Sequence, residues 1–265
     1  MPGCYRDSGA DPAKAARVLD LKSVSRSFGG VRAVDQLDLT VGQGEIVGLI
    51  GPNGSGKSTT VNLITGLFPA DSGTVYFRGE DIGGLPTHRR LQAGIGRTFQ
   101  NIRLFGQLSV WQNLWVAQNS PEDRAARGFL SRWLGGQSAV RSEIQVLLEF
   151  SGLAHKQDEL ASNLAFGEQR RLELARALAA KPKLLLLDEP AAGMNSEEIG
   201  QLRGRILSLR ERGITILLIE HVMELVMGVA DRIVVLNFGQ KIAEGPPAEI
   251  RADPLVRRAY LGGDS

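Results

Sequence analysis

The stretch Gly51-Pro52-Asn53-Gly54-Ser55-Gly56-Lys57-Ser58-Thr59-Thr60 decides the fold of this 265-residue chain. It follows an apolar run at 45–50 that is typical of a buried strand, and it opens a helical pattern. The apolar positions on one face of that predicted helix are Val61, Leu63, Ile64 and Leu67. A strand, a glycine-rich loop and a helix in this order, with the spacing G-x-x-x-x-G-K-[ST], predict a loop that binds phosphate groups.

Each residue type in this loop has a physical reason. Glycines allow backbone conformations that other residues avoid, so that successive N–H groups can converge on phosphate oxygens at a helix N-terminus. Lys57 is expected to reach the β- and γ-phosphates of a nucleotide, and the Ser58 hydroxyl is placed to ligate Mg²⁺. The expected nucleotide contacts are Gly51, Pro52, Asn53, Gly54, Ser55, Gly56, Lys57, Ser58 and Thr59.

The composition is that of an ordinary globular protein. The net charge is +2 and the pI is near 8.8, with basic residues spread along the chain, so nucleic-acid binding is not indicated. The single cysteine, Cys4, cannot form an internal disulfide and suits a reducing compartment. The apolar runs are too short to cross a bilayer. Residues 1–17 lack the apolar core of a signal peptide, so we expect a flexible extension before one domain at 18–265.

An antiparallel β subdomain is predicted on both sides of the loop. Alternating runs at 18–41, broken by a Gly29-Gly30 turn, and a strand-like run at 74–77 support it. Phe28, just before the turn, has two interpretations: it stacks on an adenine ring, or it is a core residue of the strand. Farther along, the apolar alternation stops at Gln100, where a solvated loop residue would be ordinary.

A helical subdomain at about 101–180 is predicted from a change of periodicity. The segments 111–132 and 138–153 have helical spacing. Three tryptophans in this region are expected to serve packing or an interface: Trp111, Trp115 and Trp133. A glycine-containing stretch at 164–169 precedes a helix expected over 170–180, and the exposed N–H groups at its start form a second potential anion site.

The run at 184–190 is apolar until it ends in two carboxylates, as a central parallel strand presents acids at its carboxyl end. Asp188 is expected to hold the Mg²⁺ shell, directly or through a water. Glu189 would face the attacking water as general base or positioner. His221 follows a buried strand at 214–219 and could reach a γ-phosphate as a neutral donor, although a structural role is commoner for a lone histidine.

The remaining pattern completes an α/β protein. A helix is expected at 196–212, a strand at 232–236 and a closing helix at 247–261. We therefore expect a phosphate-binding core with a mostly parallel central sheet, an antiparallel β subdomain and a helical subdomain.

The order and spacing of these motifs resemble the nucleotide-binding subunits of ABC transporters over nearly the whole chain, from 18 to 261. By this resemblance 51–58 is the Walker A loop, 164–169 the signature motif, 187–190 the Walker B strand and Gly193-Met194-Asn195 the D-loop. The resemblance implies catalytic roles for Glu189, for His221 as the switch histidine and for Gln100 of the Q-loop. It implies nucleotide contacts by Phe28, Ala165, Phe166, Gly167 and Glu168. It also implies metal contacts by Ser58, Gln100 and Asp188.

One position departs from the family pattern. Ala165 stands where the family usually has a serine, so the hydroxyl contact with the γ-phosphate is missing. The backbone N–H groups around Gly167 must then supply that contact. Longer stretches resemble one subgroup, the ATP-binding subunits of branched-chain amino acid importers, which tend to carry an alanine there. These stretches are 97–105, 165–173, 190–195 and 219–221.

The subgroup implies an ATPase that uses ATP and Mg²⁺ on the cytoplasmic face of the bacterial inner membrane. Its implied partners are two integral-membrane permease subunits and an extracytoplasmic solute-binding protein. The solute stays open, because related systems carry urea, short amides or aromatic acids and this subunit never touches the cargo.

The resemblance also implies a head-to-tail dimer, formed with a second copy or with a sister ATPase subunit. Two ATP molecules would lie between 51–58 of one protomer and Gly167 of the other. Gln100 would sense the γ-phosphate and Mg²⁺, and the segment 101–116 would dock against a permease loop.

Three alternatives remain at this point. A soluble ABC ATPase would usually carry two nucleotide-binding domains or a long coiled coil. An ABC exporter or lipid-extraction ATPase differs only in its membrane partner. An unrelated P-loop kinase or GTPase would lack the stretch 164–169 and the distant His221.

Overall fold

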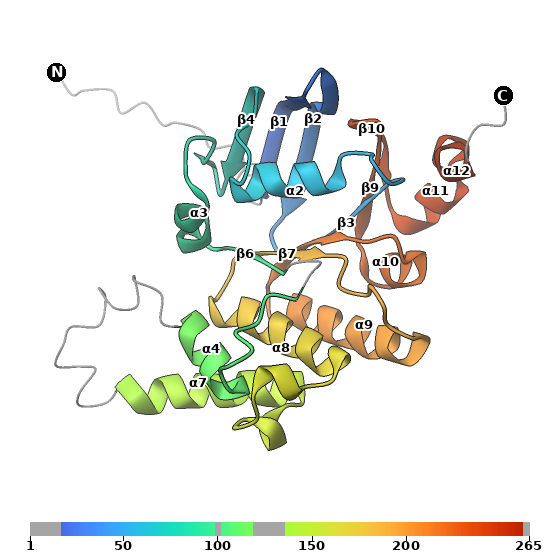
Figure 1. Cartoon of the computed structure of the whole chain (residues 1–265). Coiled ribbons are helices and arrows are strands. Elements are labelled where there is room, and N and C mark those ends of the chain that lie inside the picture. The colour runs from blue at the N-terminus through green and yellow to red at the C-terminus, as the bar shows by residue number, and fades with distance from the viewer. Residues whose placement is uncertain (1–16, 99–101, 119–135, 262–265) are drawn as a thin grey trace, which may run out of the picture.

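The computed structural model describes residues 17–98, 102–118 and 136–261, and it contains two sheets (Figure 1). The four-stranded antiparallel sheet has the order β2-β1-β4-β5, and the six-stranded sheet has the order β10-β9-β3-β8-β7-β6. The strands are β1 (Arg17–Phe28), β2 (Val31–Gly42), β3 (Ile46–Ile50), β4 (Ser72–Phe77), β5 (Glu80–Asp81), β6 (Ile95–Arg97), β7 (Leu184–Asp188), β8 (Thr215–Ile219), β9 (Arg232–Asn237) and β10 (Gln240–Gly245). All neighbouring pairs in the larger sheet are parallel except β10 with β9.

Helices cover the larger sheet and form a separate group below it in Figure 1. They are α2 (Lys57–Thr65), α3 (Thr87–Ala93), α4 (Val110–Gln118), α7 (Gly136–Ser151), α8 (Phe166–Ala179), α9 (Ser196–Glu211), α10 (Met223–Val229), α11 (Pro247–Ala252) and α12 (Pro254–Leu261), with short 3-10 turns η1 (Ala154–Lys156) and η2 (Ala161–Asn163). Among the described residues, none of these helices has the length and apolar character needed to cross a membrane.

The central strands are apolar throughout because both faces of the sheet are covered. In β3, Val47 and Leu49 join a core shared with the antiparallel sheet and α2, whereas Ile46 and Ile50 join a core beneath α8, α9 and α10. Successive side chains of a strand point to opposite faces, so two different cores require an unbroken apolar run. A third core, formed by α4, α7 and α8, makes the helical subdomain.

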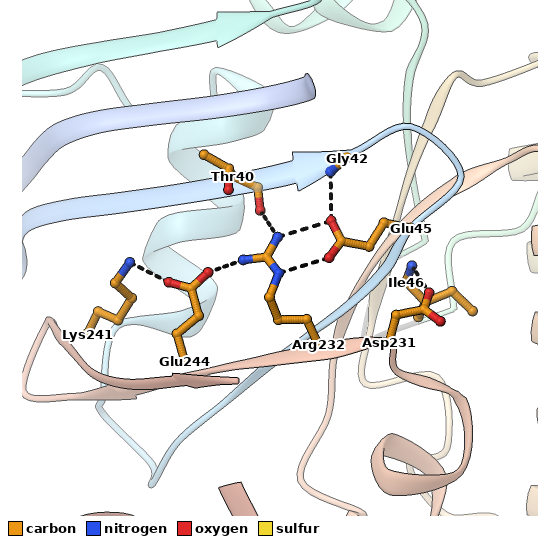
Figure 2. Close-up of polar contacts among 8 residues, drawn as sticks. All are labelled: Thr40, Gly42, Glu45, Ile46, Asp231, Arg232, Lys241 and Glu244. Carbon is orange, nitrogen blue, oxygen red and sulfur yellow. Dashed lines mark hydrogen bonds and ion pairs between the residues drawn. The ribbon is translucent and has the colours of Figure 1, made fainter. Parts of the chain in front are cut away.

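Arg232, at the start of β9, joins the two sheets (Figure 2). Its guanidinium donates to both carboxylate oxygens of Glu45, at 2.8 and 3.0 Å, and to the Thr40 carbonyl of β2 at 2.8 Å. It also pairs with Glu244 of β10, which accepts a hydrogen bond from Lys241. Burial by itself raises the pKa of Glu244, but Lys241 and Arg232 outweigh it, so the pKa lies below its usual value. The network fixes the turn before β3, and therefore the strand that carries the loop.

The structure corrects several expectations. Leu67 lies beyond the end of α2 and is 51% exposed, because Gly66 ends the helix in the left-handed region with φ of 74°. The expected closing helix is two helices, because the residue before Pro254 is disfavoured in helical conformation. The helix expected from 170 begins at Phe166. The short elements α3, α10 and β10 were not predicted. Trp133 and the span 119–132 of an expected helix lie outside the described residues.

Candidate functional site

Three neighbouring parallel strands bring the predicted phosphate loop, the acidic pair and His221 to one edge of the sheet. β8 pairs with both β3 and β7, and the registers match Leu49 with Ile219 and Asp188 with Ile219. The loop 51–56 directly follows β3, Asp188 ends β7 and is followed by Glu189, and the pair Glu220-His221 directly follows β8. Because parallel strands end at the same edge, the three segments meet where α/β proteins place their ligands.

The loop at 51–56 can only be made with glycine at two positions. Gly51 has φ of 154°, and a Cβ atom there would lie 2.2 Å from the Leu236 carbonyl oxygen. Gly56 has φ of 104°, and a Cβ atom there would lie 2.4 Å from the Ala33 carbonyl oxygen. The Gly239 N–H donates to the Ser55 carbonyl at 3.0 Å, so the β9–β10 turn braces the loop from outside.

Lys57 places its ammonium inside the loop. Its Nζ donates to the Gly51 and Pro52 carbonyls at 2.7 and 2.9 Å, and the residue is 7% exposed. Burial lowers the pKa of Lys57, and the negative charge of Glu189 raises it in part. No acidic residue stands in the first turn of α2, whose N-terminal N–H groups carry partial positive charge. A cradle of this kind, with an ammonium and an unopposed helix N-terminus, fits nucleotide phosphates.

Of the three metal donors predicted from the sequence, the Ser58 hydroxyl and the Asp188 carboxylate belong to described residues, whereas Gln100 does not. Ser58 is exposed in the first turn of α2, and Asp188 is 6% exposed at the end of β7. Asp188 Oδ2 accepts a hydrogen bond from Arg97 at 2.7 Å. Within the described ranges no three His, Cys, Asp or Glu residues form a metal-binding group. This donor set fits Mg²⁺, which is held by one or two protein oxygens together with phosphates and waters.

Glu189 adopts a strained backbone. Its φ is 48°, in the left-handed region that residues with a side chain seldom occupy. Its N–H donates to the Ile219 carbonyl of β8 at 2.9 Å, which holds the residue between the two strand ends. Such strain collects at functional sites, where surrounding contacts fix a side chain in one direction.

His221 and Glu220 behave differently, although they are neighbours. The His221 side chain is 57% exposed, and its Nδ1 lies 3.7 Å from Glu220 Oε2. Glu220 is fully buried and accepts hydrogen bonds from the N–H groups of Ala191 at 2.7 Å, His221 at 2.8 Å and Val222 at 3.0 Å. Sequence reasoning gave Glu220 no role; the available signal was an acid closing an entirely apolar strand.

Phe28 lies at the end of β1 and is 39% exposed. Its ring meets Phe68 edge-on with centroids 5.1 Å apart, and the Arg26 guanidinium lies 4.8 Å from its centroid. The Phe28 ring is thus held in place by its neighbours and remains partly accessible to a ligand. Its adenine-stacking role stays a prediction.

The signature stretch forms the first turn of α8. Ala165 is the N-cap residue and has no side-chain acceptor, but the Glu168 carboxylate accepts the Ala165 N–H at 3.1 Å. Lys156 donates to the same carboxylate at 2.9 Å and is the main reason that the pKa of Glu168 lies below its usual value. Glu168 therefore caps its own helix, which explains the early start of α8. A nucleotide contact by this anion stays a prediction.

The same turn packs against the D-loop and α9. The half-exposed Phe166 ring lies over Gly193, where a Cβ atom would be 3.4 Å from the ring. A Cβ atom on Gly167 would lie 2.9 Å from Glu198 Oε1 of α9. Gln100 lies outside the described residues, so its catalytic and metal roles stay predictions, as do those of the other site residues.

Comparisons with known proteins identify the family of this chain. The ABC transporter family model matches residues 34–192, and a model described as branched-chain amino acid ATP-binding cassette transporter matches 240–265. Over 252 residues the chain is 44% identical to the high-affinity branched-chain amino acid transport ATP-binding protein LivG of Escherichia coli. Over the same length it is 41% identical to BraF of Pseudomonas aeruginosa, a protein of the same description. Both alignments cover 92% of this chain and 98% of the relative.

Solved structures are similar as well. The ADP conformation of MJ1267, an ATP-binding cassette of an ABC transporter, superimposes with a TM-score of 0.81 at 34% identity. The match covers 93% of this chain and 99% of that one. With the phosphate loop, the acidic strand end and the α8 turn arranged as described, the chain belongs to the ABC transporter family as one of its ATP-binding ATPase subunits.

Proposed function

We propose that this ATPase drives the uptake of branched-chain amino acids or a related small solute through partner permease subunits. The observation that carries the proposal is the site at one sheet edge, on a chain that is similar over 92% of its length to LivG and BraF. Those two relatives are branched-chain amino acid transport ATP-binding proteins. The match of residues 240–265 to a family of that description supports the same cargo class and favours import over export.

In the proposed mechanism, the loop and Lys57 hold the phosphates of ATP. Lys57 would exchange its bonds to the Gly51 and Pro52 carbonyls for bonds to phosphate oxygens. Ser58 and Asp188 would hold Mg²⁺, which neutralises charge on the β- and γ-phosphates. Glu189 would orient or deprotonate the attacking water, since its strained backbone holds the residue at the strand end and its charge acts on the ammonium of Lys57. His221, which is exposed at the same edge, would contact the γ-phosphate.

A second subunit would complete the site. Part of the P-loop surface is open, because Asn53, Gly54 and Ser58 are exposed. The α8 turn with Phe166 and Gly167 would close that surface in a head-to-tail dimer, with a second copy or with a sister ATPase. Closure would exclude water and let the helix N-terminus act on the γ-phosphate.

An exposed apolar surface on the helical subdomain supports docking to a permease. Phe105, Trp115 and Val116 are 51%, 41% and 40% exposed, and Trp111 stacks on Trp115 with ring centroids 6.3 Å apart. The surface is held rigidly. Buried Asn113 accepts the Phe105 N–H at 3.0 Å and donates to the carbonyls of residues 105, 108 and 109. Gln100, just before this segment, would sense the nucleotide, and docking would hold the subunit at the cytoplasmic face of the cell membrane.

The test is to purify the tagged chain from detergent-solubilised membranes of its native host and identify bound proteins by mass spectrometry. We expect two polytopic permeases, and uptake of labelled leucine by proteoliposomes that contain the complex and its solute-binding protein. Phe105→Ala should lose the permeases while ATP binding persists. The matched control Val31→Ala removes an apolar side chain that is 69% exposed on β2 and should keep them. Recovery with ribosomal or DNA-associated proteins would refute transport, and outward-directed flux would refute import.

A further inference from the structure

Arg97, the last residue of β6, connects three segments of the nucleotide site. Its Nη2 donates to Asp188 Oδ2 at 2.7 Å, and its Nη1 donates to Asn62 Oδ1 of α2 at 2.8 Å. The Arg97 and Asp188 side chains are 12% and 8% exposed. One guanidinium thus links the helix that follows the phosphate loop to the strand that carries the acidic pair.

The chain on both sides of this contact is tied to the same strand. Arg97 pairs with Leu186 in the sheet, and the Thr98 N–H donates to the Leu186 carbonyl at 3.0 Å. The Asp188 N–H donates to the Thr98 hydroxyl at 3.3 Å. Backbone and side chain together therefore define where the Asp188 carboxylate lies, and they anchor the point from which the chain continues to Gln100.

The Arg97 contact uses one of the two carboxylate oxygens of Asp188. Arg97 donates to Oδ2, so Oδ1 is the oxygen that would serve a metal. Carboxylates that bind metals are commonly oriented in this way by a second hydrogen-bonding group.

We propose that Arg97 is a positioning residue for Mg²⁺: it holds the Asp188 carboxylate in one orientation, and it couples that orientation to α2 through Asn62. The inference rests on the placement of Mg²⁺ at Asp188 under the proposed function. Nothing in the Walker A, Q-loop, signature or Walker B assignments gives Arg97 this role.

Arg90 of α3 offers a matched control. It is also buried, at 3% exposure, and it also contacts α2, but it donates only to backbone carbonyls: those of Leu63, Ile64, Gly83 and Leu85, at 2.7 to 2.9 Å. Replacing it removes a buried arginine and lowers stability, yet it leaves Asp188 with its partner. Arg90→Met therefore separates general loosening of the fold from loss of metal positioning.

The experiment measures the affinity of the full-length chain for methylanthraniloyl-ATP in excess Mg²⁺ and in EDTA. The ratio of the two dissociation constants reports how much Mg²⁺ strengthens binding. The affinity for Mn²⁺ with saturating ADP, followed by electron paramagnetic resonance, is the second readout. Variants are Arg97→Met, Arg97→Lys, Asn62→Leu, Asp188→Asn and Arg90→Met, each checked by thermal melting.

We expect Asp188→Asn to abolish most of the Mg²⁺ effect. Arg97→Met should lower the logarithm of the ratio of dissociation constants by at least half as much as Asp188→Asn does. It should also weaken Mn²⁺ binding about tenfold or more. Arg97→Lys should restore part of it, because lysine returns the charge without the second contact to α2. Asn62→Leu should cause a smaller loss in the same direction. Arg90→Met should have a lower melting temperature but the same ratio of dissociation constants as the wild type.

The outcomes separate the two proposals. If Asp188→Asn loses the Mg²⁺ effect while folded Arg97→Met or Arg97→Lys keeps all of it, the inference about Arg97 is wrong and the metal placement stands. If Asp188→Asn keeps the effect, the metal placement is wrong and the inference fails with it. A ratio that falls equally in Arg90→Met and Arg97→Met would reduce Arg97 to a structural residue.

Discussion

Two helix N-termini of this molecule are predicted to bind the same phosphates, and they are built in opposite ways. α2 begins after Gly56 with Lys57, and its first turn carries no acid. α8 begins after Ala165, and its first turn carries Glu168, whose carboxylate caps the helix and pairs with Lys156. The N-terminus of α2 is therefore a positively charged phosphate cradle. The partial positive charge at the N-terminus of α8 is largely offset by the Glu168 carboxylate.

This difference matches a division of labour between the two ends. The α2 terminus is equipped to bind a nucleotide in a single subunit. The α8 terminus, with Glu198 beside Gly167, offers a phosphate much weaker attraction. We therefore expect α8 to add little until the other terminus has delivered the nucleotide, so that dimer closure depends on ATP already held by α2. Four substitutions test this comparison.

The largest effect is expected from Glu189→Gln, which removes the chemistry and leaves both helix termini intact. Loss of a general base costs about 10²- to 10⁴-fold in rate, so hydrolysis should nearly stop while ATP binding persists. Gel filtration with ATP should then show a stable dimer, because closure is no longer released. The control Glu211→Gln alters an exposed acid at the end of α9. Hydrolysis at the wild-type rate by Glu189→Gln would contradict the role assigned to Glu189.

Lys57→Ala should remove the stronger attraction of the α2 terminus for nucleotide phosphates. Losing one partner of a buried, charge-assisted contact costs about 3 kcal/mol, so ATP affinity should fall roughly 100-fold. Equilibrium binding of a fluorescent ATP analogue measures this loss. Lys22→Ala, a lysine whose side chain is 52% exposed on β1, should bind as wild type does. An unchanged affinity in Lys57→Ala would mean that the α8 terminus or the loop backbone holds the nucleotide.

Glu168→Gln should have a moderate effect, mainly on stability. Weakening a helix cap costs about 1 kcal/mol, while nucleotide affinity of the single subunit should stay the same. The pKa of Glu168 is lowered in the folded state, chiefly by Lys156, so its contribution is present above the unfolded pKa and is lost as pH falls through the folded value. Urea unfolding between pH 7 and pH 3 should therefore show a shallower acid decline for the variant. If the free energy of unfolding fell equally with pH in the variant and the wild type, Glu168 would not contribute to acid stability as expected.

Ala165→Ser is expected to have the smallest effect. The new hydroxyl can accept an N–H group of the first turn and should stabilise α8 by about 0.5–1 kcal/mol. It also returns the hydroxyl that the family usually presents to the γ-phosphate, so ATP-dependent dimerisation of Glu189→Gln should strengthen when the two are combined. Ala165→Gly supplies no hydroxyl and is the control. Weaker dimerisation with serine would show that this signature motif is adapted to alanine.

Local patterns predicted most of the fold and the phosphate site. The glycine loop, its strand and its helix are adjacent in sequence, so their chemistry could be deduced from spacing. The single closing helix expected at 247–261 rested on apolar spacing that continues across Pro254, where the structure divides it into α11 and α12. Contacts between distant segments could not be deduced, because Arg97 with Asp188 and Glu220 with Ala191 meet only when strands separated by helices become neighbours. The capping role of Glu168 was missed because the helix was expected to begin at residue 170, after the glycine-containing stretch 164–169.

The buried Glu220 carboxylate joins the two loops that carry the predicted catalytic residues Glu189 and His221. It holds the N–H of Ala191, two residues after Glu189, and the N–H groups of His221 and Val222. A movement of either loop is therefore transmitted to the other, since releasing one would leave a buried carboxylate oxygen without its hydrogen-bond donors. Glu189, proposed to orient or deprotonate water, and His221, proposed to contact the γ-phosphate, would then change position together during each cycle of hydrolysis.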